Sequence, residues 1–197
     1  MTTTLSPTTT TRGRVIQVAA ELFGSQGYAP TSMEQIRRVA GVSNGSLYHL
    51  FPDKVTLAAH LFSAGMHECQ AGILDSITDA ETAEQGVRDA VAWQLGWVDD
   101  NHATARILYS DVPDDVLAIA SPMHDRSARD YVRTTTHWLD RHVHEGSILD
   151  RPFAVTHALW LGPTQEYGRH WLHGRVRLRP RRVADDLATG AWAALST

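Results

Sequence analysis

The chain has 197 residues, 43% of them hydrophobic, and a formal net charge of −4, which is typical of a globular protein with a packed core. No window approaches the run of about 18 apolar residues that a membrane span requires. Cys69 is the only cysteine, which excludes an intrachain disulfide framework and a zinc site built on several thiolates.

The charge is divided unevenly along the chain. Residues 1–60 carry a net charge of +2, whereas the remainder carries −6. This polarity suits a basic module that meets phosphate and an acidic body that faces away from it, although many enzymes show similar asymmetry. Residues 1–11 are rich in threonine and lack the basic and apolar regions of a signal peptide. We therefore expect a disordered tail over residues 1–11 and a cytoplasmic protein.

The N-terminal part of the chain predicts four helices. Apolar residues at helical spacing indicate an amphipathic helix over residues 12–26, which Gly27 stops. A second helix starts at Thr31 or Ser32, both of which have capping-box spacing, and ends at Gly41. A very short third helix starts at Ser43 and extends to about residue 50. The fourth helix is long and starts after the break at residues 52–53.

The second half predicts five further helices, near residues 82–99, 102–110, 123–145, 152–174 and 181–195. The acidic run at residues 111–115 is predicted to be a loop or turn. Pro163 lies inside the fourth of these helices, so a kink or break near residues 161–162 is expected. Strand signals are nearly absent. The predicted fold is therefore all-α, with about nine helices.

The second and third helices, with the turn between them, have the arrangement of a helix-turn-helix, in which the second helix enters the major groove of DNA. Phe23, Ile36, Val39, Leu47 and Phe51 are the predicted common core. The outward residues of the short helix then include an amide that can pair with adenine, and hydroxyl and imidazole groups that can reach base edges or phosphate. These outward residues are Asn44, Gly45, Ser46, Tyr48 and His49.

The order of residues over about 12–62 resembles the tetracycline-repressor (TetR) family. The resemblance rests on Gly27-Tyr28, on the segment from Thr31 to Ile36, and on the segment Ala40-Gly41-Val42-Ser43-Asn44-Gly45-Ser46-Leu47-Tyr48-His49-Leu50-Phe51-Pro52-Asp53-Lys54. The rest of the chain is similar to the family only in length, helicity and lack of strands. Asn44 stands where the family often has Lys, and Leu50 where it often has Tyr.

The resemblance implies a helix-turn-helix DNA-binding domain over residues 12–62 and a helical effector-binding and dimerisation domain over residues 63–197. It also implies a homodimer on a near-palindromic operator in double-stranded DNA, with the helices near 152–174 and 181–195 forming the dimer interface. Together, the outward positions and the resemblance predict a DNA-binding set of Thr31, Ser32, Ser43, Asn44, Gly45, Ser46, Tyr48, His49 and Lys54.

The C-terminal body contains aromatic residues at helical spacing, which are more often core than ligand cage. In a body attached to a DNA reader, however, a pocket between helices is a usual place for a small effector. An aromatic-rich, lysine-poor lining favours an apolar or aromatic ligand. The expected lining residues are Trp93, Trp97, Tyr109, Tyr131, Trp138 and Trp160.

The sequence gives little reason to expect metal, cofactor or enzyme chemistry. His137, His142 and His144 lack the i, i+4 spacing that would place them on one face as ligands. No phosphate loop, nucleophile elbow or zinc-protease motif is present. We therefore expect no metal, no cofactor and no catalytic residues.

The predicted function is a sequence-specific DNA-binding transcriptional regulator, specifically a repressor released from its operator by a small-molecule effector. One alternative is a helix-turn-helix regulator without small-molecule control, acting as a constitutive repressor or activator. A distant alternative is an all-helical enzyme or protein-interaction module. The sequence also leaves open whether the effector releases or promotes DNA binding.

Overall fold

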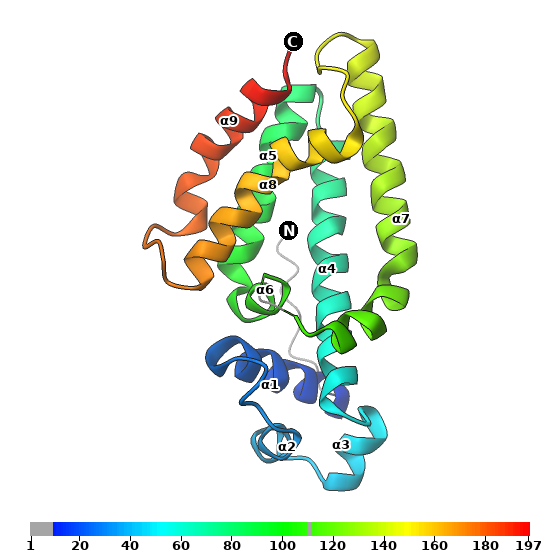
Figure 1. Ribbon diagram of the computed structural model, residues 1–197, viewed down its shortest axis with the longest axis vertical. Helices are drawn as coiled ribbons and strands as arrows, with labels where there is room; N and C mark the ends of the chain where they lie inside the picture. Colours follow the sequence, from blue (N-terminus) through cyan, green and yellow to red (C-terminus); the bar gives the residue numbers. More distant parts are fainter. Residues whose placement is uncertain (1–9, 110–111) are drawn as a thin grey trace. The chain divides into compact units, whose positions relative to one another are not determined.

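The computed structural model describes residues 10–109 and 112–197. Over these residues the chain forms nine α-helices and one short 3-10 helix, with no β-strand (Figure 1), which confirms the predicted fold class. Residues 1–9 of the predicted disordered tail lie outside the described residues. Thr11 already belongs to the first helix, which Thr10 caps by accepting a hydrogen bond from the Gly13 amide.

The first four helices begin and end where the sequence has capping signals. They are α1 (Thr11–Gln26), α2 (Met33–Ala40), α3 (Asn44–Leu50) and α4 (Lys54–Thr78). Ser32 caps α2 by accepting a hydrogen bond from the Gln35 amide, and Ser43 caps α3 in the same way. Gly41 ends α2 at φ 64°, a left-handed conformation that glycine adopts without strain.

The chain divides into two compact units. The first unit contains the described residues up to 65 together with residues 103–109 and 112–123, and the second contains residues 66–102 and 124–197. This division follows packing and is not the same as the predicted division by role at residues 62 and 63, which stays a prediction. Residues 103–108 of α6 (His102–Leu108) pack with the first unit, where Ala103 lies directly against Gly24 of α1.

The core of the first unit holds α1, α2 and α3 together. Phe23, Ile36, Leu47 and Phe51 are buried, as expected. The prediction that Val39 belongs to this core is wrong, because 54% of its surface is exposed. In a helix of only eight residues, Met33, Ile36 and Ala40 already provide the buried side, and Val39 lies beyond its edge.

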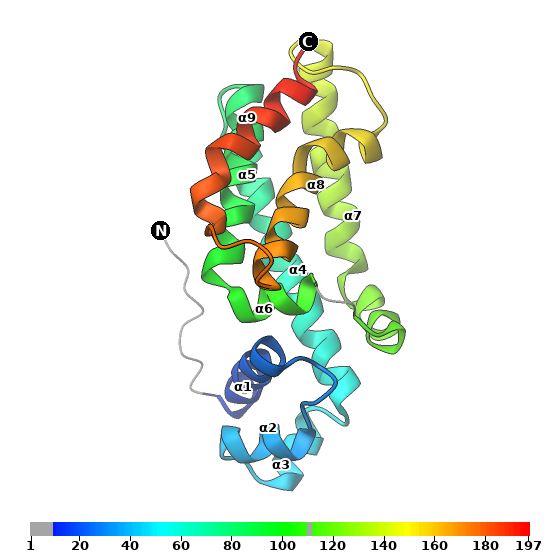
Figure 2. The same cartoon turned by 60° about the vertical axis from the view of Figure 1, so that its left-hand side comes forward.

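The second unit contains α5 (Ala83–Asp100), α8 (Phe153–Leu172) and α9 (Ala184–Leu195), which pack against one another (Figure 2). Their buried surface includes Leu95, Trp160, Leu161 and Leu195. The helix α8 is continuous through Pro163, so the predicted break is absent, and its ribbon changes direction along its length.

The remaining helix, α7 (Asp114–His144), starts nine residues before the predicted residue 123. Part of the predicted loop at residues 111–115 is therefore helical. Asp114 and Asp115 occupy the first turn, where their charges oppose the positive end of the helix dipole. Pro122 lies inside the helix and is exposed.

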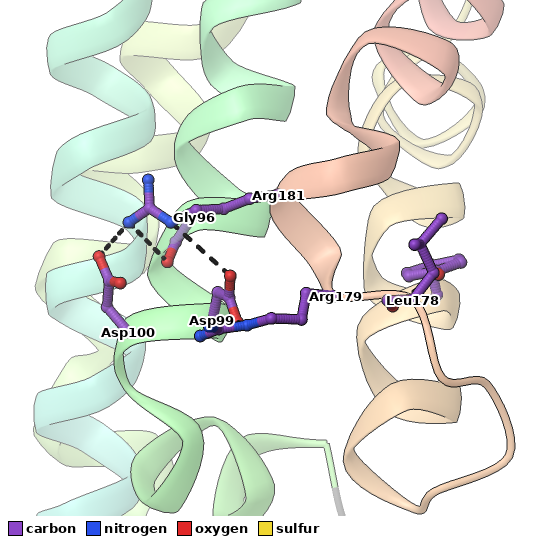
Figure 3. Close-up of polar contacts among 7 residues, drawn as sticks. Gly96, Asp99, Asp100, Leu178, Arg179 and Arg181 are labelled. Atoms are coloured by element: carbon purple, nitrogen blue, oxygen red, sulfur yellow. Dashed lines mark hydrogen bonds and ion pairs between the residues drawn. The ribbon is translucent and has the colours of Figure 1, made fainter.

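Two arginines fasten the segment before α9 to the end of α5 (Figure 3). The short helix η1 (Pro180–Val183) is preceded by Arg179, whose Nε lies 2.9 Å from a carboxylate oxygen of Asp99. Arg181 pairs with Asp100 and lies 3.7 Å from the other oxygen of Asp99. The carboxylate of Asp99 is buried, so these two cations balance a charge that water barely reaches.

Candidate nucleic-acid interface and helical body

The short helix α3 is a polar surface held on two apolar anchors. Leu47 within the helix and Phe51 at its end are fully buried, which fixes the opposite side of the helix toward solvent. The structure brings the predicted outward residues together on that exposed surface, where Tyr48 keeps 45% of its area accessible. These exposed residues are Ser43, Asn44, Gly45, Ser46, Tyr48 and His49.

Hydrogen bonds organise the start of α3. The Oγ of Ser43 accepts from the amide of Ser46 at 3.1 Å and lies 2.8 Å from the Oγ of Ser46. Both hydroxyls remain exposed, so each can exchange this contact for one to a phosphate or a base edge. Nothing lies within 4 Å of a Cβ built on Gly45, so the surface beside it is open.

The two residues at the start of α2 differ in accessibility. Ser32 is exposed, whereas Thr31 is only 1% exposed. The Thr31 hydroxyl donates to the carbonyl oxygen of Gly27 at 2.8 Å and accepts from Nε2 of Gln26 at 2.9 Å. Its hydrogen bonds therefore serve the turn between α1 and α2, which leaves Ser32 as the accessible member of the predicted pair.

Lys54, the only lysine of the sequence, is committed to the same turn. Its Nζ donates to the carbonyl oxygens of Tyr28, Ala29 and Thr31, at 3.0 to 3.3 Å, and lies 4.3 Å from the centre of the Tyr28 ring. Phosphate would have to compete with three carbonyl acceptors for this ammonium group. The carbonyls come from residues 23 to 26 positions earlier in the chain, so spacing near Lys54 gives no sign of them.

The two arginines of α2 have different surroundings. Arg37 pairs with Glu34 at 2.7 Å and also donates to the carbonyl oxygen of Val42, and its partnership lowers the pKa of Glu34. Arg38 is exposed, and the described residues place no carboxylate within ion-pair distance of it. Arg38 is thus an exposed cation in the last turn of α2. Glu34 is at ion-pair spacing from both arginines, three residues before Arg37 and four before Arg38, so spacing alone does not separate them.

The six aromatic residues expected to line an effector pocket are divided between the two units. Tyr109 belongs to the first unit and the other five to the second. Trp160 is fully buried, donates from Nε1 to the carbonyl oxygen of Val87, and stacks on Trp138 with ring centres 5.6 Å apart. Trp93 is more than one-third exposed and donates to the carbonyl oxygen of Cys69, whereas Trp97 and Tyr131 are buried.

A hollow of about 220 Å³ lies in the second unit, between the end of α4 and the last turns of α7. Trp138 is the one expected aromatic residue that lines it. The lining residues are Ile77, Thr78, Thr134, His137, Trp138 and Arg141. Sequence reasoning missed this site, because it joins segments that are more than fifty residues apart.

Polar groups also lie within the second unit. The Tyr131 hydroxyl is 3.1 Å from Nε2 of His157, and burial lowers the pKa of that imidazole. Burial raises the pKa of the Cys69 thiol to about 12. The Nε1 atoms of Trp97 and Trp138 are buried donors without a hydrogen-bond partner among the described residues. These features make the interior of this unit more polar than a simple aliphatic core.

Two kinds of feature are absent from the residues that the structure describes. No three histidine, cysteine, aspartate or glutamate side chains there lie close enough together to hold a metal ion. None of the helices in residues 10–109 and 112–197 combines the length and the apolar character needed to cross a membrane.

Comparisons with known proteins agree with this arrangement. Residues 15–61 match the model of bacterial regulatory proteins of the tetR family. The HTH-type transcriptional regulator AcrR of Shigella flexneri is 38% identical over 52 residues, which are 26% of this chain and 24% of that protein. The chain therefore matches about a quarter of the length of this curated relative.

Two solved structures extend the likeness to the whole fold. The fatty acid degradation regulator FadR of Bacillus halodurans has a TM-score of 0.78 at 14% identity, over 92% of this chain and 94% of that one. FadR of Bacillus subtilis, solved in complex with stearoyl-CoA, has a TM-score of 0.76 at 15% identity, over 91% and 97%. Residues 15–61 thus match the model of the tetR family of bacterial regulatory proteins, and the chain as a whole has the fold of these solved regulators.

Proposed function

We propose that the protein is a DNA-binding transcriptional regulator whose helix α3 enters the major groove. The observation that supports this most strongly is the polar exposed side of α3, which stands on the buried anchors Leu47 and Phe51 within a tetR-family domain. A helix of this kind presents its side chains to base edges while the preceding helix crosses the backbone. Regulation of transcription from DNA also places the protein in the cytoplasm.

The exposed groups divide into two kinds of DNA contact. Asn44 carries the amide that pairs with adenine, and the Tyr48 ring offers apolar contact to a thymine methyl group together with a hydroxyl for phosphate. Ser32, Ser43, Ser46 and His49 supply further donors to the backbone or to base edges. Arg38 adds a charge for phosphate, whereas the hydrogen bonds of Thr31 and Lys54 lie within the fold.

We further propose that the working form is a homodimer joined through α8 and α9. Val155 and Leu159 lie one turn apart on α8, with 45% and 38% of their surfaces exposed. Gly162 on α8 and Gly190 on α9 each have open space where a Cβ would lie. Glycine within a helix costs about 1 kcal/mol relative to alanine, so two open glycines beside exposed apolar residues favour close approach by helices of a second copy. A two-fold dimer fits a near-palindromic operator.

We also propose that a small molecule controls DNA binding. The free dimer occupies its operator as a repressor, and an effector bound in the second unit favours a state in which the two α3 helices no longer match their half-sites. Half-sites must lie about 34–36 Å apart to be read together, so a small change in separation is sufficient. The hollow beside Trp138 supports a ligand site in this unit.

The second candidate is a regulator without small-molecule control. The stacked and buried pair of Trp138 and Trp160 favours it, because these rings fill space that an internal ligand would need. Activation in place of repression is a variant of either model, since a ligand shifts populations only by its difference in affinity for the two states.

The test is binding of the purified full-length chain to random duplexes under selection, followed by a salt series on the enriched sequence. We expect saturable binding to one near-palindromic segment. Tyr48→Ala should weaken it at least tenfold, and Tyr48→Phe will separate the ring contribution from that of the hydroxyl. Arg38→Gln should lower the salt slope by about 1, because one phosphate contact is lost. Arg133→Gln, an exposed residue of the second unit, is the control.

Two results would contradict the proposal. If no duplex is enriched even at low salt, the protein is not a sequence-specific DNA binder. If Tyr48→Ala and Tyr48→Phe both bind the enriched duplex as the unmodified chain does, α3 is not the helix that reads it.

A further inference from the structure

The hollow between α4 and α7 has the size of a site for a one-ring ligand. Its volume of about 220 Å³ is below the 300–1,000 Å³ that is usual for larger ligands and above the roughly 150 Å³ of a cavity that admits benzene. All six lining residues belong to the second unit. Ile77 and Trp138 provide apolar surface, whereas Thr78 and Thr134 provide hydroxyls.

The charge of the hollow is positive. Arg141 is the fixed cation among the six lining residues, none of which is acidic. The described residues place no carboxylate within ion-pair distance of its guanidinium. A planar guanidinium binds carboxylates through two parallel hydrogen bonds, so an anion of this shape is the natural occupant.

A chain of contacts orients the guanidinium. Nη2 of Arg141 lies 3.1 Å from Nε2 of His142, and Nδ1 of His142 lies 2.8 Å from a carboxylate oxygen of Glu145. Because arginine can only donate, Nε2 accepts and the ring proton is on Nδ1, where it is shared with Glu145. His142 is buried, so this support is rigid and leaves the other N–H groups of the fork for a ligand.

Trp138 contributes a fixed ring to the lining of the hollow. It is only 5% exposed, and its Nε1 has no hydrogen-bond partner among the described residues, which costs about 1–3 kcal/mol. The ring is held by stacking on Trp160 and by an edge-to-face contact with His142, whose ring centre lies 4.6 Å from that of Trp138. An aromatic ligand would pack on the apolar lining that Ile77 and this ring provide.

We propose that this hollow binds a small aromatic carboxylate, with Arg141 holding the carboxylate and Ile77 and Trp138 contacting the ring. The site deepens the proposed function, on which its regulatory role rests, by giving the chemical class of the effector. Binding itself is a property of the free protein and does not depend on DNA.

Calorimetry on the purified full-length chain, with benzoate as the probe, tests the site. We expect benzoate to bind, and both benzamide and acetate to bind at least tenfold more weakly, because each lacks one half of the recognised group. Arg141→Gln should weaken benzoate binding at least tenfold. Arg129→Gln, an exposed arginine three turns earlier on α7, should leave it within twofold. Trp138→Phe keeps a ring but reduces the apolar surface of the lining and should weaken binding threefold or more.

The same protein is then titrated with benzoate while bound to its selected duplex. Benzoate that binds the free chain and changes DNA affinity supports both the site and its role. DNA binding without benzoate binding would overturn the ligand site and leave the proposed regulator intact. Benzoate binding without any DNA binding would support the ligand site and overturn the proposed regulator. Equal affinities of the unmodified chain and Arg141→Gln for benzoate would also overturn the site. Arg141 is exposed, so this variant remains informative if Trp138→Phe fails to fold.

Discussion

Lys54 lies next to the recognition helix, and its ammonium group donates hydrogen bonds to three backbone carbonyls. A hydrogen bond to a charged group contributes about 1.5–3 kcal/mol, and a partner left unsatisfied costs more than the bond itself gains. The side chain is partly accessible, so water reduces this contribution. Lys54 therefore joins the start of α4 to the turn that precedes α2, and we expect its effect on DNA binding to be indirect.

The first prediction concerns this lysine. Lys54→Met keeps the aliphatic stem and removes the donors, and we expect it to lower the free energy of unfolding by about 1–2 kcal/mol in urea titrations. Arg14→Met, at an exposed cation of the same unit, should change it by less than about 0.5 kcal/mol. DNA affinity of Lys54→Met should fall without a change in salt slope. A slope lowered by about 1 would show instead that Lys54 binds phosphate.

The exposure of some residues could be predicted from local sequence patterns, and that of others could not. The outward positions of α3 were predictable, because Leu47 and Phe51 alone determine which side of a seven-residue helix is buried. The burial of Thr31 was not predictable, because it depends on Gln26 and Gly27 in the preceding turn. Val39 was wrongly placed in the core because apolar character alone does not bury a residue at the edge of a short helix.

At the scale of elements, capping signals predicted helix starts well, whereas the acidic segment at residues 111–115 predicted the start of α7 poorly. Ser32 and Ser43 each accept a hydrogen bond from an amide three residues later, as the sequence suggests for helix starts at these residues, and Thr82 does the same before α5. The start of α7 was missed because Asp114 and Asp115 are typical of both a turn and a first helical turn. Whether these residues form a turn or the first turn of a helix depends on contacts outside the segment.

The second prediction concerns the contact between α5 and the segment before α9. Asp99→Asn removes the charge that faces Arg179 and Arg181, and we expect a loss of about 1–2 kcal/mol in unfolding free energy. Breaking a buried pair usually costs about 3–5 kcal/mol, and the exposure of both arginines reduces this value. Asp89→Asn, at an exposed position of α5, is the matched control. Equal stabilities of the two variants would show that the pairing contributes nothing.

At the scale of the molecule, the order of segments along the sequence does not show which of them pack together. Residues 103–123 fall within the predicted C-terminal domain, yet those that the structure describes pack with the first unit. No periodicity within a helix carries this information, because it depends on contacts such as that of Ala103 with Gly24, almost eighty residues earlier. The hollow joins residues 77–78 with residues 134–141 and was hidden from the sequence for the same reason.

The third prediction concerns assembly. Gly190→Leu fills the open space on α9, and we expect it to weaken dimerisation at least tenfold in sedimentation equilibrium, because two helices can no longer approach closely. Gly190→Ala should weaken it less and should stabilise the helix by up to about 1 kcal/mol. Ala92→Leu, at an exposed position of α5, should leave the dissociation constant unchanged. Dimers of normal strength in Gly190→Leu would exclude α9 from the interface.

The burial of Cys69 has a practical consequence for spectroscopy. Alkylating reagents attack the thiolate, and a thiol with a pKa of about 12 that is only 4% exposed supplies almost none at neutral pH. A second cysteine introduced at an exposed position of α3 would therefore take a spin label or fluorophore alone, with the native thiol left in place. Distances between two such labels in a dimer would then report directly on the spacing of the recognition helices, with and without a ligand.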